Sequence, residues 1–314
     1  MKNLVFLVEP ARNFKNRLPS QRPHSNKFLK QFTLFAKKKK FKMYIASADW
    51  IKKNTIEKAW YFDKTWKKAK NIPVKYAFIY FTMNKKTTKI FKHLDKYLKL
   101  MNPLPINKIC SDKLGIYKMI PKSAKMKYAL IHNKSQLKKI LSKFPSKKIV
   151  LKPRYGIRGL GIKVVSKKTL PKKIKKDTIV QEFINTAHGI KELNLKQPHD
   201  LRVILINGKI HHSYLRLPQH SFLANCAKGA KKQFVKKKSL PSSVLTLVNF
   251  VNKKLKKYKP SLYSVDVIFE NGEIPKIIEL EAIPGFMFYK GHEKLRDDTF
   301  NTIFNAFKSA YKIK

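Results

Sequence analysis

Three carboxylates lie inside two apolar runs near the C-terminal end of the sequence. Asp266 interrupts the run 263–269, and Glu279 and Glu281 alternate with apolar residues in the run 277–281. Because a strand points alternate side chains to one face, the two glutamates share a face. The stretch 270–273, Glu-Asn-Gly-Glu, is typical of a tight turn. We therefore expect the two runs to pair as a hairpin that brings Asp266 beside the glutamates.

These carboxylates predict a cation site. Three acids on one buried face repel one another and ionise reluctantly unless a cation neutralises them. A hard divalent cation with oxygen ligands, above all Mg²⁺ holding phosphate oxygens, is the most economical partner. The alternative is a solvated strand with charges at its edge. We favour the metal site because the chain has only 18 acidic residues and these three stand among isoleucines.

A glycine-rich loop follows the apolar stretch 149–151. Lys152 ends that stretch, and Gly156, Gly159 and Gly161 come before a second apolar stretch at 162–165. Glycines let a backbone approach an anion closely, and loop amides can surround a phosphate. The loop is neither a P-loop nor a dinucleotide fingerprint, because no Gly-Lys-Ser/Thr follows and strands flank it on both sides. A plain turn is the alternative, but the acid cluster favours a phosphate-covering loop.

Taken together, these motifs resemble the ATP-grasp superfamily. The resemblance is to its RimK-like and glutathione-synthetase-like carboxylate–amine ligases and to the YheC/YheD-type proteins, and it covers roughly residues 105–310. It implies ATP and one or two Mg²⁺ ions as cofactors, with Mn²⁺ as a substitute. Asp266, Glu279 and Glu281 fall on the metal ligands. The usual third ligand of the family is Asn, so Glu281 is a departure that adds a charge.

The resemblance assigns roles to further residues. Lys152 and the glycine loop would cover the phosphates, and Lys113, in the sequence Ser-Asp-Lys, would reach them, although coincidence is a rival among 63 lysines. Arg216 resembles the arginine that holds the transferred phosphoryl group, the alternative being a surface arginine. Asn225, in an Asn-x-x-x-Gly pattern, would help to bind metal or phosphate.

A hinge strand that binds adenine is also implied. Glu192 is a candidate for the ribose-binding acid, and the alternative is a loop charge. The residues that resemble the hinge are Gln181, Glu182, Phe183 and Ile184.

The net charge of +53 raises the alternative of a nucleic-acid-binding protein. However, 63 lysines against eight arginines are spread along the whole chain, whereas a binding face would concentrate them. We favour a compositional bias and expect nonspecific polyanion binding at low salt. Two cysteines, Cys110 and Cys226, fit a reducing cytoplasm. No apolar run approaches the roughly 20 residues that cross a bilayer.

The pattern of elements predicts an α/β and α+β chain with ATP-grasp architecture. Residues 1–104 would form an α/β pre-ATP-grasp domain with a parallel sheet, 105–176 a central α+β lid, and 177–314 a C-terminal α+β domain. Within the first unit, 4–8, 43–48 and 74–82 read as strands, 85–101 as a helix, and 10–31 as a loop or a substrate-facing segment. His211 and His212 would point to opposite faces of a strand in structural or surface roles.

The resemblance implies an ADP-forming, ATP-dependent carboxylate–amine ligase that works through an acylphosphate. Its partners would be a small-molecule or peptide carboxylate and an amine acceptor, and a homodimer stays open. Two alternatives remain: an ATP-binding protein without ligase activity, structural or spore-coat-like, and a basic nucleic-acid-binding protein.

Overall fold

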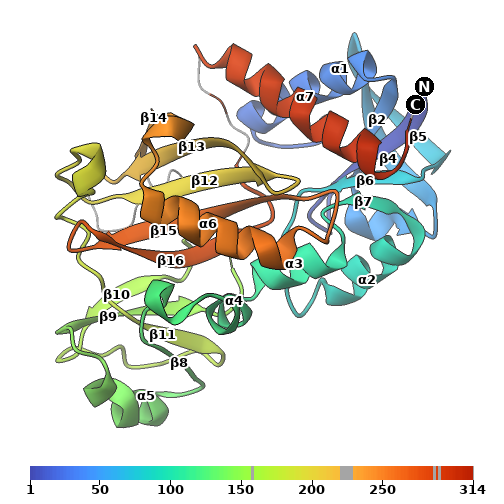
Figure 1. The fold of residues 1–314 in the computed structure, drawn as a ribbon. Coiled ribbons are helices and arrows are strands. Elements are labelled where there is room, and N and C mark those ends of the chain that lie inside the picture. Colours follow the sequence, from blue (N-terminus) through green and yellow to red (C-terminus); the bar gives the residue numbers. More distant parts are fainter. Residues whose placement is uncertain (157–158, 220–228, 286–287, 289–290, 314) are drawn as a thin grey trace.

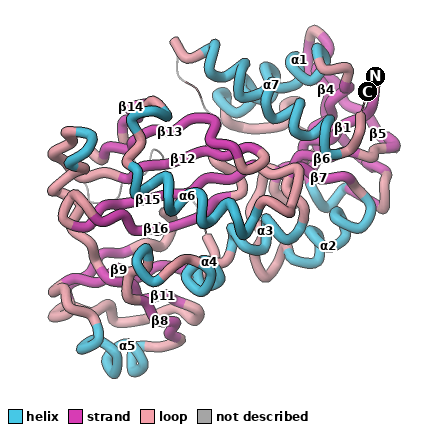
Figure 2. The backbone as a smooth tube through the Cα atoms, viewed as in Figure 1, coloured by secondary structure: helices cyan, strands magenta, loops and turns pink. Residues whose placement is uncertain are grey.

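Three β-sheets organise the molecule. The computed structural model describes residues 1–156, 159–219, 229–285, 288 and 291–313. A seven-stranded sheet comes from the N-terminal third, a four-stranded sheet from the middle, and a five-stranded sheet from the C-terminal part (Figure 1). The backbone tube in Figure 2 shows the last two sheets next to one another, with the first sheet beyond α3. The α/β and α+β architecture is thus as predicted. Among the described helices, none is both long and apolar enough to span a membrane.

The first sheet has a parallel centre. Its order is β2-β1-β6-β7, with β4 and then β5 added antiparallel beyond β2. The three predicted strands are present, although the third covers only 76–79, and the predicted helix 85–101 is helical only over 88–97, because residues 99–101 form strand β7. The elements of this part are β1 (Lys2–Val8), α1 (Pro23–Lys38), β2 (Phe41–Ser47), η1 (Ala48–Trp50), β3 (Ile51–Lys52), β4 (Thr55–Asp63), β5 (Thr65–Pro73), β6 (Tyr76–Ile79), α2 (Thr88–Tyr97) and β7 (Lys99–Met101).

Two features of this part differ from the predictions: a helix begins within 10–31, and a further hairpin is present. Helix α1 begins at Pro23, a residue that suits the first turn of a helix because its missing N–H is not needed there. Leu29, Phe32 and Ala36 form its buried face. Only residues 10–22 are irregular. The β4–β5 hairpin was not predicted, because the lysines of β5 hide its alternation; such lysines are common on edge strands.

The C-terminal helix α7 (Glu293–Ala310) returns to the first sheet. It lies beside α1 in Figure 1. The rings of Phe32 and Phe300 pack with centroids 4.8 Å apart, and those of Phe78 and Phe307 are 5.0 Å apart. Aromatic pairs of this kind bury large apolar areas. The last helix therefore completes the hydrophobic core of the N-terminal sheet, although the sequence groups it with residues 177–314.

The second sheet has the order β10-β9-β11-β8. Strand β11 pairs with β8 and β9, so the hinge strand belongs to this sheet and not, as predicted, to the last unit. The elements are α3 (Leu104–Ser111), α4 (Lys113–Met119), η2 (Lys122–Ala124), β8 (Tyr128–Ile131), α5 (Lys134–Ile140), η3 (Leu141–Lys143), β9 (Lys148–Pro153), β10 (Lys163–Ser166) and β11 (Thr178–Glu182).

The third sheet is antiparallel, in the order β14-β13-β12-β15-β16. The predicted β15–β16 hairpin is confirmed. Its turn places Asn271 and Gly272 at φ 53° and 77°, the left-handed values that a tight hairpin turn needs. The elements are η4 (Lys191–Leu193), β12 (Asp200–Ile206), β13 (Lys209–Leu217), β14 (Lys231–Val235), η6 (Lys237–Ser239), α6 (Ser242–Leu255), β15 (Leu262–Glu270) and β16 (Ile274–Glu281).

An extra residue in β13 overturns the prediction for the two histidines. Ile204 pairs with His212 and Leu205 with Ile210, so His211 has no partner in the ladder. A bulge of this kind turns side chains away from strict alternation. The Nδ1 atoms of His211 and His212 consequently lie 2.8 Å apart instead of on opposite faces.

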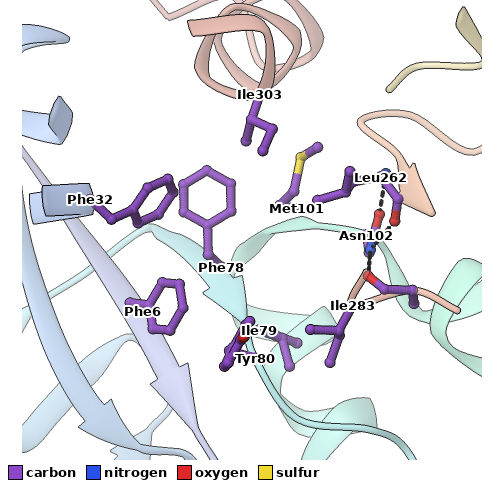
Figure 3. Close-up of a pocket in the computed structure, with 11 residues that line it drawn as sticks. Phe6, Phe32, Phe78, Ile79, Tyr80, Met101, Asn102, Leu262, Ile283 and Ile303 are labelled. Atoms are coloured by element: carbon purple, nitrogen blue, oxygen red, sulfur yellow. Dashed lines mark hydrogen bonds between the residues drawn. The ribbon is translucent and has the colours of Figure 1, made fainter. Parts of the chain in front are cut away.

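Asn102 joins the first sheet to the third (Figure 3). Its side-chain amide donates to the carbonyls of Leu262 (2.7 Å) and Ala282 (2.6 Å), and its Oδ1 accepts from Leu262 N at 2.6 Å. These bonds fix the start of β15 and the residue after β16 against the end of β7. The adjoining cavity of about 20 Å³ has room for a water molecule but not for a nucleotide.

Candidate active site

The predicted acid cluster forms on one face of the β15–β16 hairpin. Asp266 lies opposite Glu279 in the antiparallel ladder, and Ser264 lies opposite Glu281. Directly opposed residues point to the same face, as do Ser264 and Asp266, two positions apart on one strand. The structure thus brings the three predicted metal ligands together.

Two arginines hold the buried Asp266. Arg202 donates from Nε to Oδ1 at 2.8 Å and from a terminal nitrogen to Oδ2 at 2.5 Å. Arg216 donates to Oδ2 at 2.6 Å, and the Ser264 hydroxyl donates to Oδ1 at 3.2 Å. Four hydrogen bonds occupy the roughly four lone-pair sites of a carboxylate. Burial raises the pKa of Asp266, but the charges of Arg202 and Arg216 outweigh burial and lower it.

The two glutamates are less enclosed. Glu281 pairs with Arg202 at 2.8 Å and Glu279 with Lys113 at 2.9 Å. Their side chains are 19% and 25% exposed, against 0% for Asp266. Burial raises the pKa of Glu281 although Arg202 opposes it. In the described part of the chain, Glu279 Oε2 and Glu281 Oε1 accept no hydrogen bond, so each glutamate keeps one oxygen for another ligand.

Asp200 completes the cluster at the start of β12. Its Oδ2 accepts from the same Arg216 nitrogen that reaches Asp266. Asp200 Oδ1 and Arg216 Nε are both buried and have no hydrogen-bond partner among the described residues. Burial raises the pKa of Asp200 to about 7 against the opposing charge of Arg216. An unpaired buried N–H of an arginine is costly, and an incoming oxyanion would satisfy it.

The cluster as it stands balances its own charge. Four carboxylates (Asp200, Asp266, Glu279, Glu281) face four cations (Lys113, Lys152, Arg202, Arg216). Among the described residues, no group of three or more His, Cys, Asp or Glu side chains is arranged to hold a metal ion. The donor set fits Mg²⁺ at Glu279 and Glu281, which have free oxygens, whereas Asp266 is saturated by its arginines. A divalent cation therefore fits this site together with an anion that offsets its charge.

Lys152 is buried beside the cluster. Its Nζ donates to the Tyr117 hydroxyl at 2.7 Å and to the Ile278 carbonyl at 3.4 Å. Burial and the charge of Lys113 lower its pKa to about 7, although Glu279 opposes them. Tyr117 in turn donates to Gln181, and burial raises its pKa well above the ordinary value. The phenol is therefore neutral and orients the lysine.

The glycine loop is fastened to the cluster through Lys113. Lys113 Nζ donates to the carbonyl of Gly156 at 2.7 Å while it pairs with Glu279. Gly159 and Gly161 have φ values of 67° and 76°, which favour glycine. A Cβ at Gly161 would also come within 2.9 Å of Pro153. The sequence prediction of a glycine hairpin between two strands is confirmed, since β9 and β10 pair on either side of it.

At the base of the loop, Asp112 and Arg154 form a two-point ion pair. The two hydrogen bonds are 2.7 and 2.6 Å long. Asp112 also caps helix α4 through Leu114 N at 3.1 Å. These contacts position Lys113 at the start of the helix.

The hinge residues lie at the end of β11. The Gln181 side-chain oxygen accepts a hydrogen bond from the Tyr117 hydroxyl, and its nitrogen donates to the Met126 sulfur at 2.9 Å. Glu182 accepts from Lys127 N at 3.1 Å through its carboxylate and pairs with the same residue through its backbone. Phe183 lies under the ammonium of Lys148, with 5.7 Å to the ring centroid. Ile184 packs on the hydrophobic core of the third sheet. Their role in adenine binding stays a prediction.

Of two further predicted site residues, one lies apart from the cluster and the other lies outside the described residues. Glu192 is exposed on η4, and the neighbouring Lys191 N bonds to Gly272 O at 3.0 Å. It thus lies at the turn end of the β15–β16 hairpin, whereas the acids lie toward the other end. Its ribose role stays a prediction. Asn225 is outside the described residues, as are Ile157 and Arg158 of the glycine loop.

Sequence reasoning did not assign Asp200, Arg202 or Tyr117. The signal for the first two was available. Asp200 and Arg202 alternate at the start of the otherwise apolar run 200–206, and all seven residues of that run are buried. Charged residues are rarely fully buried unless they are paired, so this pattern indicates a partner. Tyr117 carries no comparable signal.

Comparisons with known proteins bear on the fold. The model of the RimK-like ATP-grasp domain matches residues 106–293. A search of curated protein sequences found no match. Among solved structures, the fold is similar to that of a Bacillus anthracis D-alanine–D-alanine ligase complexed with ATP, at 12% identity and TM-score 0.62, with 99% of each chain covered. At these identities, solved structures establish the fold only.

Two further structures cover nearly the whole chain. One is a Chryseobacterium gregarium RiPP-associated ATP-grasp ligase in complex with ADP and a leader and core peptide, at 14% identity and TM-score 0.63, covering 99% of this chain and 97% of that one. The other is a RimK domain ATP-grasp protein from Sphaerobacter thermophilus, at 9% identity and TM-score 0.63, covering 96% and 98%.

Proposed function

The chain belongs to the RimK-like ATP-grasp family, and on that premise we propose that it is an ATP- and Mg²⁺-dependent carboxylate–amine ligase. A substrate carboxylate would attack the γ-phosphate of ATP and release ADP. An amine would then attack the acylphosphate carbonyl and release phosphate. A free carboxylate is a poor electrophile, and phosphorylation gives it a leaving group.

One observation carries the proposal: three cations that can hold phosphate oxygens lie around the acid cluster, which includes two partly exposed glutamates. Lys113 contacts Glu279 and the glycine loop, and Lys152 lies against the same strand through Ile278. Arg216 reaches the cluster through Asp266. Phosphoryl transfer requires positioning and charge neutralisation more than covalent chemistry from the protein, and this constellation can supply both.

Glu279 and Glu281 would hold Mg²⁺, because each retains one free carboxylate oxygen within the described chain. Asp266 would join them only by giving up one of its four hydrogen bonds. When bound, the metal would neutralise charge on the phosphate oxygens. Because the cluster is already balanced, we expect the ion to bind with the nucleotide and not before it.

The remaining steps fall to the protein's own residues. Arg216 would hold the transferred phosphoryl group, since its Nε is a buried donor without a partner among the described residues. Lys152 and Lys113 would neutralise the nucleotide phosphates. Gly156, Gly159 and Gly161 would let the loop close and keep water from the acylphosphate. Gln181, Glu182, Phe183 and Ile184 would line the adenine side.

The test is trapping with hydroxylamine, which converts an acylphosphate into a stable hydroxamate. The purified protein is incubated with ATP, Mg²⁺, hydroxylamine and a mixture of amino acids and acidic peptides. The proposal predicts hydroxamate and ADP in equal amounts, and neither with Glu279→Gln. Formation of AMP and pyrophosphate would contradict it, because that outcome requires an acyl-adenylate.

A second candidate, a nucleotide-binding protein without ligase activity, is favoured by one feature. The saturation of Asp266 by two arginines leaves one expected metal ligand engaged elsewhere. That function predicts MgATP binding without ADP release under any of the trapping conditions.

A further inference from the structure

Most described arginines of this chain form ion pairs with aspartates. The sequence has eight arginines against 63 lysines. In the structure, each described arginine outside residues 10–22 bonds to an aspartate. These four pairs are Arg154–Asp112, Arg202–Asp266, Arg216–Asp200 and Arg296–Asp297. The pattern agrees with the planar guanidinium, which matches a carboxylate better than an ammonium does. Lysine, by contrast, is the residue that fills the surface.

The other described arginines are concentrated in one short segment. Arg12, Arg17 and Arg22 lie within residues 10–22, and all three are exposed. Their guanidinium groups have no ion pair or hydrogen bond in the part of the chain that the structure describes. Three exposed guanidiniums without partners in one short segment are consistent with carboxylates supplied by another molecule.

The segment is irregular but anchored. The Phe14 ring packs against Trp50 and Trp60, with centroids 5.5 and 5.4 Å away. Trp60 Nε1 donates to the Asn16 carbonyl at 3.2 Å. Near its start, Ala11 N donates to Asp49 at 3.3 Å. A loop held at several points presents its arginines with less conformational entropy left to lose on binding.

The position of the segment is that of a ligand site in an open α/β sheet. Residues 10–22 follow the carboxyl end of β1, and the parallel order β2-β1-β6 changes direction between β1 and β6. Ligands of such sheets bind at this switch point. Figure 3 shows Ile79 and Tyr80, at the end of β6, beside Ile283. Because Ile283 is two residues after Glu281, the chain just beyond the acid cluster lies beside the end of β6.

We propose that residues 10–22 bind an acidic peptide, with Arg12, Arg17 and Arg22 pairing with its carboxylates. This deepens the proposed function, because it names the class of carboxylate substrate. A peptide suits three separate guanidiniums better than a single amino acid does. Single-stranded nucleic acid fits less well, because its sites use exposed aromatic rings for stacking, and here Trp50 and Trp60 are only 8% and 1% exposed.

The experiment is a fluorescence anisotropy titration with a labelled oligoglutamate peptide at physiological ionic strength. The test variant carries Arg12→Gln, Arg17→Gln and Arg22→Gln. Its matched control carries Lys172→Gln, Lys173→Gln and Lys175→Gln, three exposed lysines between β10 and β11 that remove the same charge. We expect roughly tenfold weaker binding for the test variant and roughly twofold or less for the control. Arg→Lys at the three positions should fall between the two.

Two outcomes would overturn the proposal. Equal losses in both triple variants would show that the overall charge attracts the peptide. Tighter binding of a single-stranded oligonucleotide that depends on the same arginines would assign the segment to nucleic acid. Thermal stabilisation by MgATP, measured on every variant, confirms folding and separates the two proposals. Arginine-dependent peptide binding without hydroxamate formation would leave this inference standing and refute the ligase.

Discussion

Lys113 connects Glu279 to the glycine loop, because its Nζ lies 2.9 Å from the Glu279 carboxylate and donates to the Gly156 carbonyl at 2.7 Å. One buried cation thus links a candidate metal ligand to the flap that would cover the phosphates. Binding of a nucleotide and metal would compete for both contacts. We therefore expect the order of the loop to depend on this lysine.

Removal of this link should loosen the loop. In Lys113→Ala we expect faster amide hydrogen exchange in residues 154–162 and roughly tenfold weaker ATP binding, because a charge-assisted contact to phosphate is lost. Lys118→Ala, an exposed position on the same helix, is the matched control. Unchanged exchange and affinity in Lys113→Ala would remove this lysine from the site.

Lys152 predicts a pH dependence of stability. Its pKa is lowered to about 7 in the folded chain from 10.5. Between these values the unfolded chain holds a proton that the folded chain has released, so the free energy of unfolding rises with pH. Lys152→Met lacks this contribution. In urea denaturation, the free energy of unfolding of wild type should rise relative to that of the variant from about pH 7 to pH 10. If the two free energies change with pH in parallel, the shifted pKa is contradicted.

Tyr117 should act through Lys152 and Gln181. Tyr117→Phe leaves the Gln181 oxygen without its buried donor, a loss worth about 1–3 kcal/mol of stability. It also removes the hydroxyl that accepts from Lys152, so ATP affinity should fall. The control is Tyr128→Phe, at the ring stacked 4.5 Å from Tyr117, and ATP affinity should fall less in this variant. Thermal melts with and without MgATP separate the two effects. An equal response of both variants would show that the phenol does not position Lys152.

The carboxylates should divide into structural and catalytic groups. Asp266→Asn leaves Arg202 and Arg216 short of a buried counter-charge and should cost about 3–5 kcal/mol. Glu279→Gln, on a side chain that is 25% exposed, keeps an oxygen that can accept from the buried Lys113, so it should cost less stability than Asp266→Asn while abolishing ATP turnover. Chemical denaturation and ADP release measure the two properties. A large stability loss in Glu279→Gln would contradict this division.

Mg²⁺ and ATP should bind together. Because four carboxylates already face four cations, Mg²⁺ alone should not raise the melting temperature, whereas Mg²⁺ with ATP should. Stabilisation by Mg²⁺ alone would show a preformed metal site.

The hairpin and the glycine loop could be predicted because their signals are local. Alternation on both sides of Asn271-Gly272 predicts the hairpin, but an extra residue at Ile278 shifts the register between Val267 and Asp266, and this shift sets Asp266 opposite Glu279. By contrast, the pairing of Arg202 with Asp266 depends on β12 lying beside β15, a contact between positions 64 residues apart. No local pattern encodes such a neighbour, and the saturation of Asp266 was missed for that reason.

Other errors have equally specific causes. The bulge at His211 changes the face of one side chain without any Gly or Pro to signal it. Helix α7 returns to the first sheet through an apolar face of Phe300, Phe304 and Phe307. In the sequence, this face indicates that the helix is buried, but it does not identify the sheet against which the helix packs. The β4–β5 hairpin is hidden by its lysines.

The fate of the carboxylate oxygen tests the central claim most directly. An acidic peptide with heavy oxygen in its carboxylates is incubated with the protein, ATP, Mg²⁺ and an amine, and the inorganic phosphate is analysed by mass spectrometry. An acylphosphate route predicts one heavy oxygen in each phosphate released, together with ADP. Phosphate without heavy oxygen, formed while the amide product accumulates, would contradict the account.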